Sequence, residues 1–141
     1  MSRRIRIPAT TANLGSGFDC IGLALDLWNE IEIVEGTTGL EVVGYGSKTL
    51  SNPAGNLMYT SFERLINECG QSMPNVKLLS SNHIPLTRGL GSSAAAVVGG
   101  LFTANILIGE PLSSSELLNL ASKIEGHPDN VAPALFGGCV I

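Results

Sequence analysis

The residues best suited to do chemistry lie in the stretch P-L-T-R-G-L-G-S-S-A-A-A-V-V-G-G at positions 85–100. Gly89 and Gly91 bracket a single residue, and glycine tolerates a positive φ and lets a ligand approach the backbone. Ser92 and Ser93 follow where a helix takes its N-cap and first-turn residues. A glycine loop that enters a helix directs unpaired N–H groups and the positive end of the helix dipole at one point. The stretch predicts a phosphate-binding loop, although an ordinary turn and cap would show the same pattern.

Known phosphate-loop patterns narrow this prediction. The pattern G-x-x-x-x-G-K-[ST] is absent, because no lysine follows either glycine, and the nucleophile elbow G-x-S-x-G does not fit. The spacing Gly89-x-Gly91-x-x-Ala94 does match the looser dinucleotide fingerprint, and Glu110 lies near the distance expected for a ribose contact. Glu110 lies in a loop-like G-E-P, so dinucleotide binding stays open as an alternative.

Two other segments accompany the glycine loop: I-P-A-T-T-A-N-L-G-S-G-F-D at 7–19 and H-P-D-N-V-A-P-A-L-F-G-G at 127–138. With the loop between them, they resemble, in order, the three motifs of the homoserine kinases, within the GHMP small-molecule kinases. The resemblance spans nearly the whole chain. It implies ATP-dependent phosphorylation of the side-chain hydroxyl of L-homoserine to O-phospho-L-homoserine, in threonine biosynthesis. Alternatives are a GHMP kinase acting on mevalonate, a sugar or a methylerythritol derivative, and a nucleotide-binding module without catalysis.

The resemblance also implies which residues bind ATP and Mg²⁺. The ATP contacts are expected at Pro85, Leu86, Thr87, Arg88, Gly89, Leu90, Gly91, Ser92, Ser93, Ala94 and Ala95, with Asn56 and Tyr59 near the adenine. Mg²⁺ prefers a few oxygen ligands and keeps its waters, so one hydroxyl and one carboxylate would suffice. In the family these match Ser93 and Glu125. Arg88 would add positive charge beside the phosphates, or would simply be a solvated loop residue.

The same resemblance places the substrate contacts. Asn13 and Asp19 match the motif that lines the substrate pocket, where a carboxylate suits an ammonium group and an amide both donates and accepts. From the residues alone, an Asx-turn and a cap explain both. Asn130 is expected on the substrate hydroxyl, with Asp129 as a helix cap. The catalytic residues implied are therefore Ser93, Glu125 and Asn130, without an identified base.

Composition excludes several other classes. The 141 residues are 44% hydrophobic and 14% charged, which is typical of a folded chain with one core. The formal net charge of −4 argues against nucleic acid and membrane surfaces as partners. Three cysteines without C-x-x-C spacing suit a reducing compartment. No apolar signal region follows the basic start, so a cytoplasmic location is expected.

Periodicity predicts the elements. We expect strands at 4–7, ended by Pro8, at 21–27 and at 28–35, where isoleucines alternate with glutamates. A turn at 36–39 and a return strand at 40–45 predict a hairpin. Helices are expected at 56–69 and from Ser93 onward, with a strand at 76–81 between them. The box S-x-x-E at 113–116 opens a further helix, and Asp129 would cap a short one.

These elements predict a two-layer α+β fold with a mixed or antiparallel sheet backed by helices. The resemblance adds a left-handed β-α-β unit, against the usual right-handed rule. Homoserine kinases are longer and carry a second domain, and this chain ends on the apolar run G-G-C-V-I. We therefore expect residues 1–141 to form an N-terminal, ATP-binding domain, truncated before the C-terminal domain and inactive alone. A homodimer stays open.

Overall fold

The computed structural model describes residues 3–17 and 20–141 of the chain. In chain order the elements are β1 (Arg3–Thr11), the 3₁₀ turn η1 (Gly15–Gly17), β2 (Gly22–Glu35), β3 (Gly39–Gly44), the 3₁₀ turn η2 (Pro53–Gly55), α1 (Leu57–Glu68), β4 (Val76–Asn82), α2 (Ser92–Leu107), α3 (Ser114–Glu125), α4 (Val131–Phe136) and β5 (Cys139–Val140).

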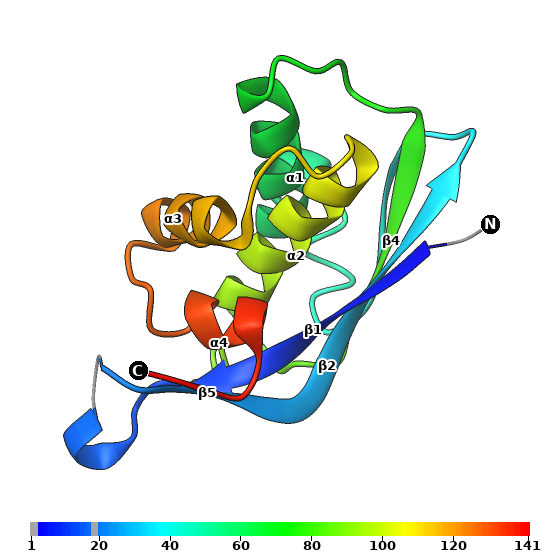
Figure 1. The fold of residues 1–141 in the computed structure, drawn as a ribbon. Helices are drawn as coiled ribbons and strands as arrows, with labels where there is room; N and C mark the ends of the chain where they lie inside the picture. The colour runs from blue at the N-terminus through cyan, green and yellow to red at the C-terminus, as the bar shows by residue number, and fades with distance from the viewer. Residues whose placement is uncertain (1–2, 18–19) are drawn as a thin grey trace.

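One sheet and a layer of helices make up the fold, and Figure 1 shows the helices together on one face of the sheet. The strand order is β1-β2-β4-β3, and β5 pairs with the start of β2. The β3–β4 pair is parallel, whereas β1–β2, β2–β4 and β2–β5 are antiparallel. The predicted α+β class with a mixed sheet backed by helices is confirmed. The handedness of the β3-α1-β4 unit stays a prediction.

The two faces of the sheet follow the predicted alternation. The inward side chains Ile5, Ile7, Ile31 and Ile33 are buried in the core. On the outer face Arg4 lies 3.7 Å from Glu30 and 3.6 Å from Glu32. These ion pairs are solvent-exposed and contribute little to stability. Burial of the isoleucines therefore sets which face the helices cover.

Strand β1 is longer than predicted, because Pro8 does not end it. The register with β2 shifts between Pro8 and Ala9, and pairing then continues to Thr11. Proline is tolerated on an edge strand and at a bulge, where its missing N–H leaves no ladder bond unmade. This extension places Thr10 within the sheet and beside the glycine loop.

The predicted hairpin at 36–45 is wrong. Strand β3 forms, but it pairs with β4 in parallel, with Leu40 opposite Leu78, and β4 lies between β3 and β2. Helix α1 provides the crossover that a parallel pair needs. The strands expected at 21–27 and 28–35 are one continuous strand, β2. Residues 23–27 are half-buried or exposed rather than fully buried.

Helices α1 and α2 pack closely at the glycine pair Gly99-Gly100 of α2. A Cβ on Gly100 would overlap the backbone oxygen of Met58 in α1. A Cβ on Gly99 would lie 2.8 Å from Ile31 Cδ1 and 3.0 Å from Ile7 Cδ1. The two glycines therefore let α2 approach both the helix and the sheet. Helix α2 is buried along most of its length.

The helix starts differ from prediction at two places. The N-cap of α2 is Gly91 rather than a serine, and the N-cap of α4 is Asn130 rather than Asp129. The Asp129 carboxylate instead accepts the backbone N–H of Asn130 at 3.0 Å. The S-x-x-E capping box of α3 is confirmed, and the C-cap of this helix is Gly126 with φ 90°. Within the described ranges, the structure contains no helix long and apolar enough to cross a membrane.

Candidate functional site

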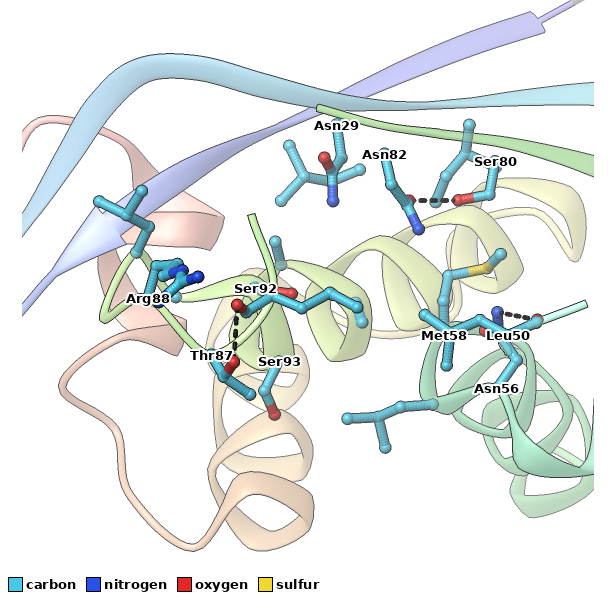
Figure 2. Close-up of a pocket in the computed structure, with 18 of the residues that line it drawn as sticks. Asn29, Leu50, Asn56, Met58, Ser80, Asn82, Thr87, Arg88, Ser92 and Ser93 are labelled. Carbon is cyan, nitrogen blue, oxygen red and sulfur yellow. Dashed lines mark hydrogen bonds between the residues drawn. The ribbon is translucent and has the colours of Figure 1, made fainter. Parts of the chain in front are cut away.

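A cavity of 460 Å³ lies between the sheet, the start of α1 and the loop that leads into α2 (Figure 2). The glycine loop and the first turns of α2 form one wall. The lining residues are Ile7, Asn29, Ile31, Leu50, Gly55, Asn56, Leu57, Met58, Ser80, Asn82, Leu86, Thr87, Arg88, Gly89, Leu90, Gly91, Ser92, Ser93, Ala95 and Ala96. The predicted phosphate loop therefore borders a space large enough for a small-molecule ligand.

The loop backbone is tightly folded. Thr87, Gly89 and Gly91 have φ values of 56°, 69° and 68°, all in the left-handed region. A non-glycine residue costs about 1–2 kcal/mol in this region, so Thr87 holds its conformation against a local preference. The N-cap of α2 is Gly91, which has no side chain that could accept a hydrogen bond from the first turn of the helix. The N–H groups of the first α2 turn thus remain available to an anion.

Strand β1 contacts this loop through Thr10. The Thr10 backbone N–H donates to the Leu90 carbonyl at 2.9 Å. A Cβ on Gly91 would overlap Thr10 Oγ1. Glycine is therefore required at position 91 for two reasons: its positive φ, and the lack of space for a Cβ beside the strand.

The side chains of Ser93 and Glu125 contact each other beside the first turn of α2. Ser93 Oγ donates to Glu125 Oε2 at 2.8 Å, although the residues are 32 positions apart. Glu125 is the last residue of α3, where a carboxylate opposes the dipole of its own helix, but it lies at the N-terminus of α2, where the dipole favours it. The left-handed Gly126 turns the chain away and leaves this carboxylate at the site.

This pair tests whether the site suits Mg²⁺. One hydroxyl and one carboxylate are hard oxygen ligands, and Mg²⁺ typically takes one or two carboxylates together with substrate phosphates and waters. Residues 3–17 and 20–141 contain no group of three or more His, Cys, Asp or Glu side chains that could hold a metal alone. The donors therefore fit a cation shared with a phosphate ligand better than a structural metal.

Asn130 reaches the same region from the start of α4. Thr10 Oγ1 donates to Asn130 Oδ1 at 2.8 Å. Strand β1 thus contacts both the glycine loop and the third sequence motif. Glu125 and Asn130, far from the loop in sequence, approach it through Ser93 and Thr10 respectively.

Asn56 lies at the opposite end of the cavity. Its Oδ1 accepts the Tyr59 N–H at 3.0 Å as the N-cap of α1, and its Nδ2 donates to the Leu50 carbonyl at 2.9 Å. Tyr59 lies outside the cavity lining and packs on Phe62, with ring centroids 5.9 Å apart. Burial, and secondarily the Glu63 carboxylate, raises the pKa of Tyr59. Its contact with a nucleotide stays a prediction.

Sequence reasoning missed the polar residues that the sheet contributes. Asn29 Oδ1 accepts the N–H groups of His83 at 2.8 Å and Ile84 at 2.9 Å, which fixes the start of the glycine-loop segment. Ser80 Oγ donates to Asn82 Oδ1 at 2.9 Å. Figure 2 shows Asn29, Ser80 and Asn82 together on the sheet side of the cavity. The signal was present, because Asn29 shares the inward face with Ile31 and Ile33, and Ser80 shares it with Leu78.

The remaining predicted site residues are placed as follows. Leu86 through Ser93, Ala95 and Asn56 line the cavity, whereas Pro85, Ala94 and Tyr59 do not. Asn13 is exposed on the segment between β1 and η1. Asp19 lies outside the described residues. The binding roles of these residues stay predictions.

The dinucleotide alternative is wrong. That fold requires a mostly parallel sheet, whereas the strands here are mainly antiparallel. Glu110 lies in the turn after α2 with φ 59°, its N–H donating to the Asn105 carbonyl at 2.7 Å. It is also absent from the residues that line the cavity.

The chain belongs to the GHMP kinase family, since the family model "GHMP kinases N terminal domain" matches residues 56–138. The homoserine kinase of Carboxydothermus hydrogenoformans is 50% identical over 139 residues, covering 97% of this chain and 46% of the relative. The homoserine kinase of Picosynechococcus sp. is 49% identical over 145 residues, covering 98% and 48%.

A solved structure shows the same likeness in three dimensions. The crystal structure of homoserine kinase from Cytophaga hutchinsonii superimposes with a TM-score of 0.83 at 31% identity, covering 98% of this chain and 47% of that one. The chain thus spans about half the length of the relatives that it matches.

Proposed function

We propose that this chain is the N-terminal, ATP-binding domain of an enzyme that transfers the γ-phosphoryl group of ATP to the side-chain hydroxyl of L-homoserine. The product would be O-phospho-L-homoserine. The observation that carries the proposal is the glycine loop entering α2 at a glycine N-cap, with Ser93 and Glu125 joined beside it. The choice of homoserine as acceptor is supported by about half the residues being identical to those of homoserine kinases.

The loop would hold the nucleotide phosphates. Phosphoryl transfer depends on positioning and charge neutralisation more than on covalent chemistry. The first-turn N–H groups of α2 donate to phosphate oxygens, and the helix dipole favours their negative charge. Arg88, exposed on the same loop, adds positive charge nearby.

Ser93 and Glu125 would hold Mg²⁺. Bound there, Mg²⁺ would neutralise charge that develops on the phosphate oxygens. Their 2.8 Å hydrogen bond keeps the hydroxyl and carboxylate oxygens together at the first turn of α2. Both residues lie at helix ends, so rigid elements fix their spacing.

The acceptor would bind where Asn130 and the segment after β1 lie. Asn130 is proposed to contact the acceptor hydroxyl, and Asn13 and Asp19 are proposed to contact the rest of homoserine. An amide does not take up a proton at neutral pH, so Asn130 orients the acceptor rather than acting as a base. If Asp129→Asn keeps near-normal turnover while Asn130→Ala loses it, this assignment stands; the reverse result would make Asp129 the important group.

The test is ADP release by the intact protein that carries this chain, with Mg-ATP and with or without L-homoserine. Strong dependence on homoserine is the expected result. Turnover that ignores homoserine but responds to mevalonate or a sugar would replace the acceptor and keep the kinase. ATP binding without turnover for any acceptor would make the chain a nucleotide-binding module. A cytoplasmic location and a homodimer remain further predictions.

A further inference from the structure

Thr10 lies where three parts of the site meet. Its side chain is completely buried in β1, directly after the register shift at Pro8. Its backbone N–H donates to the Leu90 carbonyl in the glycine loop at 2.9 Å. Its hydroxyl donates to Asn130 Oδ1 at 2.8 Å, across 120 residues of sequence.

Both contacts are held in place by the surrounding backbone. Thr10 pairs with Ala24 of β2, so the sheet fixes its position. Gly91 leaves room for the hydroxyl, since a Cβ there would overlap Thr10 Oγ1. The residue therefore ties Asn130 to the loop through one rigid strand, instead of letting each be set by its own flexible segment.

We infer that Thr10 is a positioning residue that sets the Asn130 amide relative to the phosphate loop. The inference rests on the proposed function and deepens it. The loop would hold the phosphoryl donor and Asn130 would contact the acceptor hydroxyl, so Thr10 fixes the distance between donor and acceptor. Misplacement of such a group by about 1 Å is enough to cost a large factor in rate.

The hydrogen bond also decides which part of the amide faces the acceptor. With Oδ1 accepting from Thr10, the Nδ2 hydrogens are free to donate, and among the hydrogen bonds of residues 3–17 and 20–141 they make none. A hydroxyl oxygen accepts such a bond. Asn130 is therefore held as a donor to the acceptor oxygen.

The experiment compares Thr10→Val, which keeps the shape and removes the hydroxyl, with Thr10→Ser, which keeps the hydroxyl. Thr10→Val is expected to lower kcat for homoserine phosphorylation about tenfold, the effect of one lost hydrogen bond, with little change in the KM for Mg-ATP. Thr10→Ser is expected to retain most of the wild-type kcat. A Thr10→Val enzyme with the wild-type kcat, or a Thr10→Ser enzyme as slow as Thr10→Val, would overturn the inference.

Asn130→Ala provides the second comparison. If Thr10 acts through Asn130, adding Thr10→Val to the Asn130→Ala enzyme lowers its residual kcat by a much smaller factor than Thr10→Val lowers the kcat of the wild-type enzyme. The same loss in both backgrounds would contradict this route. Thr103→Val is the matched control for loss of a buried threonine hydroxyl, because Thr103 Oγ1 is buried and makes no hydrogen bond in the described part of the chain. It is expected to leave kcat unchanged.

A measurement without turnover separates this inference from the proposed function. The side-chain amide resonances of Asn130, assigned by their loss in Asn130→Ala, are followed by NMR in wild type, Thr10→Val and Thr10→Ser. A clear shift in Thr10→Val alone supports the inference even if homoserine proves not to be the substrate. Unchanged resonances would refute it even if homoserine kinase activity is strong. If Thr10→Val does not fold, Thr10→Ala takes its place in each measurement.

Discussion

The N-termini of α2 and α3 are built in opposite ways. At α3, Ser113 and Glu116 close a full capping box: Glu116 Oε2 accepts the Ser113 N–H at 2.8 Å, and Ser113 Oγ accepts the Glu116 N–H at 3.3 Å. At α2 the N-cap is Gly91, which has no side chain to offer, and the first turn borders a 460 Å³ cavity.

This difference separates stability from binding. The capping box satisfies the donors of α3 internally, so that end of the helix needs no ligand. The glycine N-cap leaves the donors of α2 available, and the carboxylate that approaches them comes from the far end of α3. One helix start thus stabilises the fold, and the other is suited to bind an anion.

The largest expected effect comes from closing the space at α2 with Gly91→Ala. The alanine would have to adopt φ 68°, and its Cβ would overlap Thr10 Oγ1. We therefore expect the free energy of unfolding to fall by about 3 kcal/mol and ATP binding to be lost. Gly89→Ala is the matched control, because its φ is 69° but a Cβ there meets nothing within 4 Å. It should cost only about 1 kcal/mol in urea denaturation. Equal losses for the two variants would contradict the role given to the Thr10 contact.

The next effect concerns the paired oxygens. Glu125→Gln and Ser93→Ala are expected to lower kcat about 100-fold and to raise the Mg²⁺ concentration needed for half-maximal activity. Their stability should change little, since the hydrogen bond between them is exposed. The control is Glu110→Gln, a carboxyl change in the turn that follows α2, at the opposite end of the helix from Ser93. Unaltered Mg²⁺ dependence in both site variants would remove the basis of the metal assignment.

Breaking the cap of α3 should lower stability and leave ligand binding unchanged, the opposite of the effect expected for Ser93→Ala and Glu125→Gln. Ser113→Ala removes the side-chain acceptor and is expected to lower the free energy of unfolding by about 1 kcal/mol. Because the α3 start lies away from the cavity, the Kd for Mg-ATP should stay at the wild-type value. Thermal unfolding and calorimetric titration of one preparation give both numbers. A variant that binds ATP more weakly without losing stability would reverse the contrast.

The smallest effect is a pH dependence of α3. The Ser113 N–H, and secondarily its hydroxyl, lowers the pKa of Glu116 below its ordinary value. A carboxyl with a lowered folded-state pKa stabilises the fold above its unfolded-state pKa, and this contribution is lost as pH falls through the folded-state pKa. Tm measured from neutral to acidic pH should therefore fall slightly less in Glu116→Gln than in wild type. Parallel curves would show that the cap carries no such linkage.

Much of the fold could be predicted from local signals. The box S-x-x-E places the start of α3, and the stripe that includes Phe62 and Leu65 places α1. Alternating isoleucines give the inward face of β1 and β2. These features depend on neighbours in sequence, where spacing alone decides the geometry. The glycine loop was predictable for the same reason.

What sequence reasoning missed depends on tertiary contacts. Nothing local to residues 36–45 reveals that β4 inserts beside β2, so a hairpin was predicted instead of a parallel pair. The N-cap of α2 is Gly91 rather than Ser92, at a position where a Cβ would overlap Thr10 Oγ1, a contact that the local sequence does not reveal. Asn29 and Ser80 reach the cavity only because the sheet brings them opposite the loop, although their inward positions gave a hint.

The most direct test of the contrast between the two helix starts is an NMR titration of the backbone amides with Mg-ATP. The N–H resonances of residues 89–94 are predicted to shift strongly and saturably, while those of residues 114–116 stay unmoved. Saturable shifts confined to 89–94 would establish the open start of α2 as the phosphate site. Unmoved 89–94 resonances at ATP concentrations that saturate the protein, or equal shifts at both helix starts, would contradict it.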